Sequence, residues 1–279
     1  MNNCRRSLIA LAPFLFVAAI ALLTAPYAGA QDGGVTVRKQ SQLSKLVPAA
    51  DVEKAAAEQY AQLLRDAAKK GALAAPGDAQ LRRIRAISQR IMPFAPKWNS
   101  RAPGWKWEIN VLRSAEINAF CLPGGKIAVY TGLISSLNPS DAEIAIVIGH
   151  EMAHALREHA RAQMAQQAVT SLGANLLSQI LGLGDTGNAV LGASAGLLGL
   201  RFSRDDESDA DTVGLELAAR AGYDPRAGVT LWQKMQASHA GGQAPQWLSS
   251  HPADSNRVAQ IQGHLPEVLP LYEKARKPR

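Results

Sequence analysis

The stretch that decides the fold runs from Ile144 to His159 and reads IAIVIGHEMAHALREH. It contains the pattern H-E-x-x-H, with histidines at 150 and 154 and a glutamate at 151. Residues four apart share one face of a helix, so both imidazoles can reach one metal ion. Two neutral nitrogens and a third protein ligand suit zinc and leave a fourth position for water. Glu151 would lie beside that water, where it can accept a proton.

The flanking residues predict a helix over this motif independently. Ser140 followed by Glu143 forms a capping box before an apolar run, so a helix should begin near Asp141. Gly149 precedes the first histidine and Ala153 the second, so little bulk surrounds the imidazoles. The alternative is a pair of core histidines without a metal, but these flanks favour the metal site.

A third ligand must come from beyond His154. The extended pattern H-E-x-x-H-x-x-G-x-x-H fails, because its last two fixed positions hold Arg157 and Ala160. His159 lies five residues after His154, which on a continuous helix turns it away from the metal face. We therefore expect His159 to be a structural or surface histidine.

An acidic run after residue 203 offers a glutamate instead. Glu207 and Asp211 are four apart and share a helix face, so Glu207 is the candidate third ligand. Asp211 would accept a hydrogen bond from the far nitrogen of a ligating histidine. Asp206 and Asp209 face elsewhere, and we expect them to be solvated charges at the helix start. The alternative is an acidic first turn with no metal role.

Three short strands are expected before the motif helix. Residues 105–111 alternate apolar and polar, and strands at 117–120 and 126–130 flank a turn containing Gly124 and Gly125. The fold class that follows is α+β and mainly helical, a zincin-like domain with a small antiparallel or mixed sheet. An edge strand could pair with an extended substrate backbone. The candidate edge residues are Asn118, Ala119 and Phe120, with a buried hairpin as the alternative.

Further helices are expected at 51–70, from a cap at Asp78, at 226–238 and after Pro252, in a helix that carries Arg257 and Ile261. Residues 169–200 are rich in Gly, Ala and Leu, and 182–187 divide them into runs too short to span a bilayer. We expect buried helices or a helical hairpin there, with a mobile lid or membrane-touching hairpin as the alternative. The predicted domains are a signal peptide (1–30), an N-terminal arm and helix (31–75) and a zinc metallopeptidase domain (76–279).

The N-terminus has the pattern of a secretory signal peptide. Arg5 and Arg6 precede an apolar run, and Ala28-Gly29-Ala30 supplies a cleavage site. We expect cleavage after Ala30 and export to the periplasm, with an uncleaved membrane anchor as the alternative. Cleavage leaves Cys121 as the one cysteine, so no internal disulfide is expected.

The net charge of +7 is spread along the chain without a dense Lys/Arg stripe or a nucleic-acid motif. We expect no nucleic-acid partner. The positive charge could favour peripheral contact with an anionic membrane surface, and the simpler interpretation is a solvated surface.

A His-Pro turn near the C-terminus is a further candidate site. Ser250-His251-Pro252 leads into a helix that carries Arg257. His251 is expected either to stabilise an oxyanion or to bind the metal as a fourth ligand at rest. Arg257 is expected to bind substrate or to hold the loop by an ion pair. The alternative is a structural turn.

These motifs, in this order, resemble the gluzincin family that includes the HtpX heat-shock protease and the type 1 CAAX prenyl protease. The resemblance covers roughly Pro76 to Leu265. Its matching segments are 118–120, 123–127, 130–133, 149–154, His159, 203–204, Glu207, 210–211, Gly214, 221–225, 250–252 and Arg257. It implies one Zn²⁺ per chain, held by His150, His154 and Glu207, and hydrolysis of peptide bonds. No transmembrane span is expected beyond the N-terminal segment, so the short periplasmic branch with BepA and LoiP fits better.

The expected function is that of a zinc-dependent endopeptidase of the cell envelope. Its substrates would be unfolded or misassembled envelope proteins, cleaved in quality control in the periplasm or at the outer membrane. The alternative is a zinc-bound chaperone or scaffold for outer-membrane protein assembly, with weak or latent proteolysis.

Overall fold

The computed structural model describes residues 33–180, 196–239, 246–252 and 256–277 of the 279-residue chain. The predicted signal peptide and the central part of the Gly-rich segment lie outside these residues. Within them, no helix is both long and apolar enough to cross a membrane.

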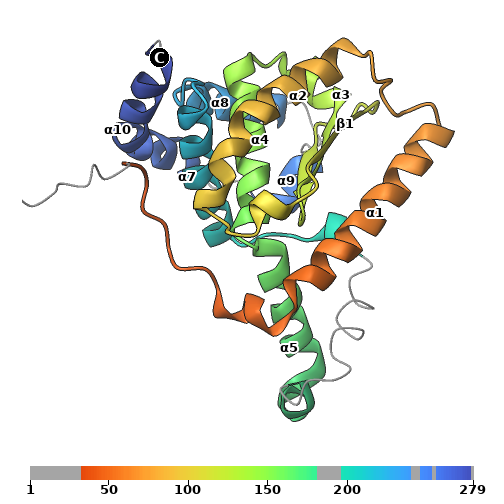
Figure 1. Cartoon of the computed structure of the whole chain (residues 1–279). Helices are drawn as coiled ribbons and strands as arrows, with labels where there is room; N and C mark the ends of the chain where they lie inside the picture. The colour runs from red at the N-terminus through yellow and green to blue at the C-terminus, as the bar shows by residue number, and fades with distance from the viewer. Residues whose placement is uncertain (1–32, 181–195, 240–245, 253–255, 278–279) are drawn as a thin grey trace, which may run out of the picture. The chain divides into compact units, whose positions relative to one another are not determined.

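The described elements are mostly helical and surround one small sheet, as the sequence predicted (Figure 1). The helices are α1 (Ala49–Lys69), α2 (Ala79–Ile91), α3 (Thr131–Leu137), α4 (Asp141–Leu156), α5 (His159–Ile180), α7 (Arg204–Arg220), α8 (Ala227–His239), α9 (Gln246–Ser250) and α10 (Arg257–Arg276). Short 3-10 turns are η1 (Gln42–Leu46), η2 (Met92–Lys97), η3 (Ala102–Gly104) and η4 (Leu197–Gly199). The strands are β1 (Glu108–Leu112), β2 (Ala119–Leu122) and β3 (Lys126–Tyr130).

The sheet is mixed, with strand order β1-β3-β2. β1 runs parallel to β3, with Ile109 opposite Ile127, and β2 runs antiparallel to β3, with Cys121 opposite Ile127. The tight β2–β3 turn needs positive φ at Gly124 (81°) and Gly125 (79°), which glycine adopts at little cost. β2 lies at one edge and pairs with no second strand among the described residues.

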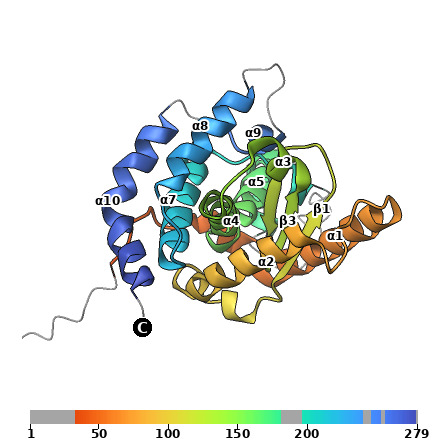
Figure 2. The same cartoon turned by 90° about the horizontal axis from the view of Figure 1, so that it is seen from above.

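Helix α4 lies at the centre of the fold. The capping box predicted at its start is present: the Ser140 hydroxyl accepts from the Glu143 N–H, and the Glu143 carboxylate accepts from the Ser140 N–H. Ile144, Ile148 and Met152 are fully buried, and each such side chain contributes about 1.5–3 kcal/mol of hydrophobic stabilisation. Figure 2 views α4 end-on, with α7 on one side and the sheet on the other. The core therefore forms around the helix that carries the H-E-x-x-H motif.

Two glycines allow α4 and α7 to approach closely. A Cβ built on Gly149 would lie 2.7 Å from the carbonyl oxygen of Gly214, and a Cβ on Gly214 would lie 2.7 Å from the amide nitrogen of His150. Neither glycine has positive φ, so the requirement is one of space rather than of backbone conformation. The contact brings the first histidine of the motif against the acidic helix.

The N-terminal helices pack on this centre, as expected. Asp78 caps α2 by accepting from the amides of Gln80 and Leu81. The Tyr60 hydroxyl of α1 donates to the Ile127 carbonyl of β3. Residues 33–47, here called the N-terminal strap, run along the folded unit, where the Val35 N–H donates to the buried carboxylate of Glu216 at 2.8 Å.

Candidate metal centre and active site

Four side chains converge at the middle of the fold. His150 and His154 come from α4, Glu207 from the first turn of α7, and His251 from the residue after α9. Each residue is no more than 3% exposed. Their candidate ligand atoms all lie within 4.8 Å of one another. The structure thus brings together the three predicted ligands and the predicted fourth.

The spacing within this cluster fits a metal ion. Ligand atoms about 2.0–2.1 Å from a tetrahedral ion are separated by about 3.3 Å. Nε2 of His150 lies 3.1 Å from Nε2 of His154 and 3.3 Å from Nδ1 of His251. The Glu207 carboxylate lies 3.5, 3.4 and 2.9 Å from these three nitrogens in turn. Several lone pairs facing one point are stabilised by a cation at that point.

Glu207 and His154 favour the ionisation states that metal ligands need. Burial opposes the charge on Glu207, but hydrogen bonds and charge from His154 and His251 outweigh it and hold its pKa below the ordinary range. Burial lowers the pKa of His154 well below its ordinary value, although Glu207 acts in the opposite direction. At neutral pH the site therefore holds a carboxylate and a neutral imidazole, both competent to bind a cation.

Asp211 and Arg257 support the cluster from behind. Nδ1 of His150 lies 2.9 Å from Oδ1 of Asp211, in the arrangement predicted for a carboxylate that orients a ligating histidine. Arg257, 1% exposed, donates from NH2 to Asp211 at 2.7 Å and from NH1 to Glu207 at 2.9 Å. Burial opposes ionisation of Asp211, but the charge of Arg257 and the His150 hydrogen bond lower its pKa. Arg257 does not line the cavity, and the ion pairs that it makes are with Glu207 and Asp211 on α7.

Glu151 has a partner that the sequence did not reveal. The indole Nε1 of Trp247 donates to Oε1 of Glu151 at 2.7 Å. The Trp247 ring also stacks on His251, with centroids 4.8 Å apart and planes 25° from parallel. Trp247 lies on the five-residue helix α9, which no capping or periodicity signal predicted, so its approach to the motif could not be foreseen.

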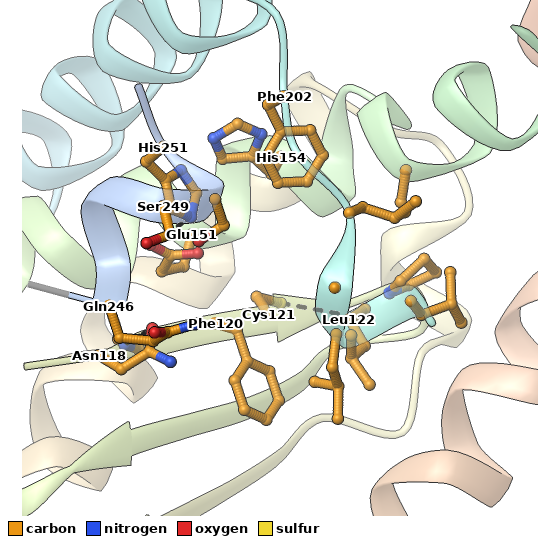
Figure 3. A pocket seen from close by; sticks show the side chains of 18 residues that line it. Asn118, Phe120, Cys121, Leu122, Glu151, His154, Phe202, Gln246, Ser249 and His251 are labelled. Carbon is orange, nitrogen blue, oxygen red and sulfur yellow. Dashed lines mark hydrogen bonds and ion pairs between the residues drawn. The ribbon is translucent and has the colours of Figure 1, made fainter. Parts of the chain in front are cut away.

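A cavity of about 130 Å³ opens beside these groups. Its lining includes Glu151, His154 and His251 on one side and, on the other, Asn118 and Phe120 at the start of β2 (Figure 3). Ala119, the first residue of β2, lines it as well. Leu197, Leu200 and other apolar side chains also line the cavity. The predicted substrate-binding residues therefore lie beside the predicted catalytic glutamate. Cys121 also lines the cavity, and burial raises the pKa of its thiol.

Two expectations for polar residues near the site were wrong. His159 does not turn away from the motif, because α4 ends at Leu156 and the chain turns through Glu158 at φ 59° before α5 begins. Its Nδ1 lies 3.0 Å from Nδ1 of His154. Asp209 is not a solvated charge, because it is 5% exposed and contacts His159 and Arg157. The prediction from helical spacing was wrong for His159 because α4 ends at Leu156, before His159 is reached.

Comparison with known proteins agrees with this geometry. The model of Peptidase family M48 matches residues 78–265, which is more than half of the chain. The mitochondrial metalloendopeptidase OMA1 of Arabidopsis thaliana is 39% identical over 184 residues, which cover 64% of this chain and 36% of that protein. OMA1 of Bos taurus is 32% identical over 215 residues, which cover 72% of this chain and 40% of that protein. The beta-barrel assembly-enhancing protease of Escherichia coli K12 is 28% identical over 173 residues, covering 58% and 35%.

The matched region corresponds to less than two thirds of each of these relatives. It nevertheless contains the whole cluster of candidate ligands and the glutamate beside it. The enzyme class predicted from the sequence, a metalloendopeptidase, agrees with the family and with the names of the OMA1 relatives. The chain belongs to peptidase family M48.

Proposed function

We propose that this chain is a zinc-dependent endopeptidase of the cell envelope that cleaves unfolded or misassembled proteins. The observation that carries the proposal is the convergence of His150, His154 and Glu207 beside Glu151, on a cavity walled by an edge strand. Imidazole and carboxylate ligands suit zinc, which when bound polarises a carbonyl and acidifies water.

The chain's own residues divide the remaining work. Glu151 accepts the proton of the attacking water and returns it to the leaving amine. Trp247 holds one oxygen of that carboxylate by its 2.7 Å hydrogen bond and leaves the other oxygen for water. His251 either donates to the developing oxyanion or binds the metal at rest. Arg257 fixes Glu207 and Asp211, so the ligand side chains keep their orientation.

The outer edge of β2, which pairs with no other strand in the described part of the chain, supports a polypeptide substrate. Backbone N–H and C=O groups on an edge strand can pair with an extended chain. Ala119 and Phe120 lie on that edge and line the same cavity as Glu151. A substrate must be extended to pair in this way, which favours unfolded segments over folded ones.

The envelope location rests on the N-terminal pattern of residues 1–30 and on the relatives. The E. coli relative is named a beta-barrel assembly-enhancing protease, and the OMA1 relatives are named mitochondrial. The similarity to the E. coli relative, together with the signal-like N-terminus, supports assignment to the short periplasmic branch. It also supports a periplasmic location and a role in quality control. The proposal includes peripheral contact of the chain with the membrane surface.

The test combines location, cleavage and the Glu151→Gln variant. We expect the chain in the periplasmic fraction, shortened by about 30 residues, and cleavage of an unfolded outer-membrane protein but not of its folded form. Glu151→Gln should keep zinc and lose cleavage. A variant that retains the full cellular role without cleavage would instead support a zinc-bound scaffold. Recovery of the unshortened chain in the cytoplasm would contradict the envelope proposal.

A further inference from the structure

His159 lies directly behind a candidate metal ligand. Helix α4 ends at Leu156, and positive φ at Glu158 returns the chain so that His159 opens α5 facing back toward the motif. The rings of His154 and His159 are 5.0 Å apart between centroids and inclined by 78°. Nδ1 of His159 lies 3.0 Å from Nδ1 of His154, and His159 is 4% exposed.

Metal ligation through Nε2 of His154 would determine where the protons lie on these two rings. His154 presents Nε2 to the cluster, 3.1 Å from Nε2 of His150 and 3.4 Å from Oε1 of Glu207. A ligating Nε2 is unprotonated, so the remaining proton of neutral His154 must be on Nδ1. This Nδ1–H has the Nδ1 of His159 as its acceptor. The proton of His159 is then on Nε2, which lies 3.0 Å from Oδ2 of Asp209.

Asp209 is itself held in place. Nε of Arg157 donates to Oδ2 of Asp209 at 2.7 Å. The same guanidinium donates to the carbonyl oxygen of Arg38 in the N-terminal strap. Arg157 is 8% exposed and Asp209 is 5% exposed, so water competes little for these contacts. A continuous series of hydrogen bonds therefore runs from the strap backbone to the far nitrogen of His154.

The two histidines of the motif are supported in different ways. His150 contacts a carboxylate directly, that of Asp211 at 2.9 Å. His154 reaches its carboxylate through a second imidazole. Partners of this kind fix the tautomer and orientation of a ligating histidine and raise its basicity, and losing one lowers metal affinity or activity by about 10–100-fold.

We infer that His159, anchored by Asp209 and Arg157, is a positioning residue that keeps His154 in the tautomer presenting Nε2 to the metal. This inference rests on the proposed zinc function. It assigns a role in metal binding to a histidine outside the H-E-x-x-H motif that binds no metal itself. His159→Leu should remove the acceptor and weaken zinc binding. In His159→Gln, by contrast, the side-chain carbonyl of the glutamine can still accept from Nδ1 of His154.

The experiment measures zinc affinity of the full chain by competition with a chromogenic chelator, together with the visible absorption of the Co²⁺-loaded protein. We expect about 10–100-fold weaker zinc binding and a shifted Co²⁺ spectrum for His159→Leu, with substantial recovery in His159→Gln. Asp209→Leu, which removes the acceptor for Nε2 of His159, should also weaken zinc binding and provides a second test if His159→Leu does not fold. The matched control is Tyr60→Phe, which removes a buried hydrogen bond between α1 and β3 that involves none of the cluster residues.

The inference is overturned if His159→Leu or Asp209→Leu binds zinc as tightly as the wild-type chain does and gives an unchanged Co²⁺ spectrum. It is also overturned if His159→Gln is no better than His159→Leu, or if Tyr60→Phe weakens binding equally. Failure of the proposed function looks different, because the wild-type chain itself would then bind no zinc.

Discussion

The indole N–H of Trp247 donates to Oε1 of Glu151 at 2.7 Å, although 96 residues separate them in sequence. The contact joins α9 to the H-E-x-x-H helix and leaves Glu151 one oxygen for other partners. Trp247 does not line the cavity, so it acts on substrate through the residues it contacts: Glu151, the stacked His251, and His150, whose ring centroid lies 5.4 Å from that of Trp247. Because Trp247 does not touch the substrate directly, a substitution there measures what its contacts contribute to catalysis.

Trp247→Phe should lower kcat by about 10-fold or more and leave KM and zinc content nearly unchanged. A hydrogen bond to a charged group is worth about 1.5–3 kcal/mol, and each 1.4 kcal/mol is about tenfold in rate. Steady-state cleavage of a fluorogenic peptide gives both constants. The matched control is Trp105→Phe, which removes an indole hydrogen bond to Glu53 remote from the site. Equal losses in the two variants would show that the effect is structural.

Gly214→Ala should destabilise the fold and weaken zinc binding. Its Cβ would lie 2.7 Å from the amide nitrogen of His150, so α4 and α7 must separate. We expect a loss of about 1–3 kcal/mol, as for other overpacked sites. The control is Gly263→Ala in α10, where no atom lies within 4 Å of the new Cβ. That variant should be neutral or more stable by up to about 1 kcal/mol. Denaturant unfolding distinguishes them, and a neutral Gly214→Ala would refute the close approach.

Arg257→Gln should lower the free energy of unfolding by about 3–5 kcal/mol, because it leaves two buried carboxylates without their cation. Zinc affinity should fall as well, since Glu207 and Asp211 lose the donors that orient them. Arg226→Gln removes an exposed ion pair with Asp224 and should leave the free energy of unfolding nearly unchanged. Thermal unfolding followed by circular dichroism measures both variants. Similar effects in the two would contradict the positioning role of Arg257.

The cap of α4 should make stability depend on acid. Burial opposes the charge on Glu143, but hydrogen bonds from Lys234, Ser140 and Thr230 and the Lys234 charge hold its pKa below the ordinary 4.5. The unfolded chain therefore takes up the proton first as pH falls. The stabilisation is complete above about pH 4.5 and is lost as pH falls through the folded-state pKa.

Glu143→Gln tests this dependence, because glutamine can still complete a capping box. The free energy of unfolding of the wild type should exceed that of the variant by about 1 kcal/mol at neutral pH, and this difference should shrink below about pH 4.5. Urea unfolding at several pH values measures it. A difference that stays constant down to about pH 2, or grows on acidification, would contradict the assigned pKa direction.

The helices that carry the ligands were predictable because their signals are local. Ser140 with Glu143 marks the start of α4, and the spacing of His150 to His154 and of Glu207 to Asp211 places each pair on one face. These features depend only on helix geometry. The residues predicted for the β2 edge likewise line the cavity.

The partners of those ligands were not predictable. His159 was misjudged because neither glycine nor proline marks the end of α4, and the turn depends on Glu158 at positive φ. Asp209 was misjudged because its burial depends on Arg157 and His159 from the neighbouring helix ends. Trp247 meets Glu151 only through tertiary packing. Contacts between elements far apart in sequence leave no periodic pattern to read.

The most direct test of the account measures zinc content and peptide cleavage in Glu151→Gln and Glu207→Gln, side by side with the wild-type chain. We expect one zinc per chain and cleavage in the wild type, one zinc without cleavage in Glu151→Gln, and loss of both in Glu207→Gln. Full zinc occupancy and affinity in Glu207→Gln, or undiminished cleavage in Glu151→Gln, would contradict the assignment of ligand and base.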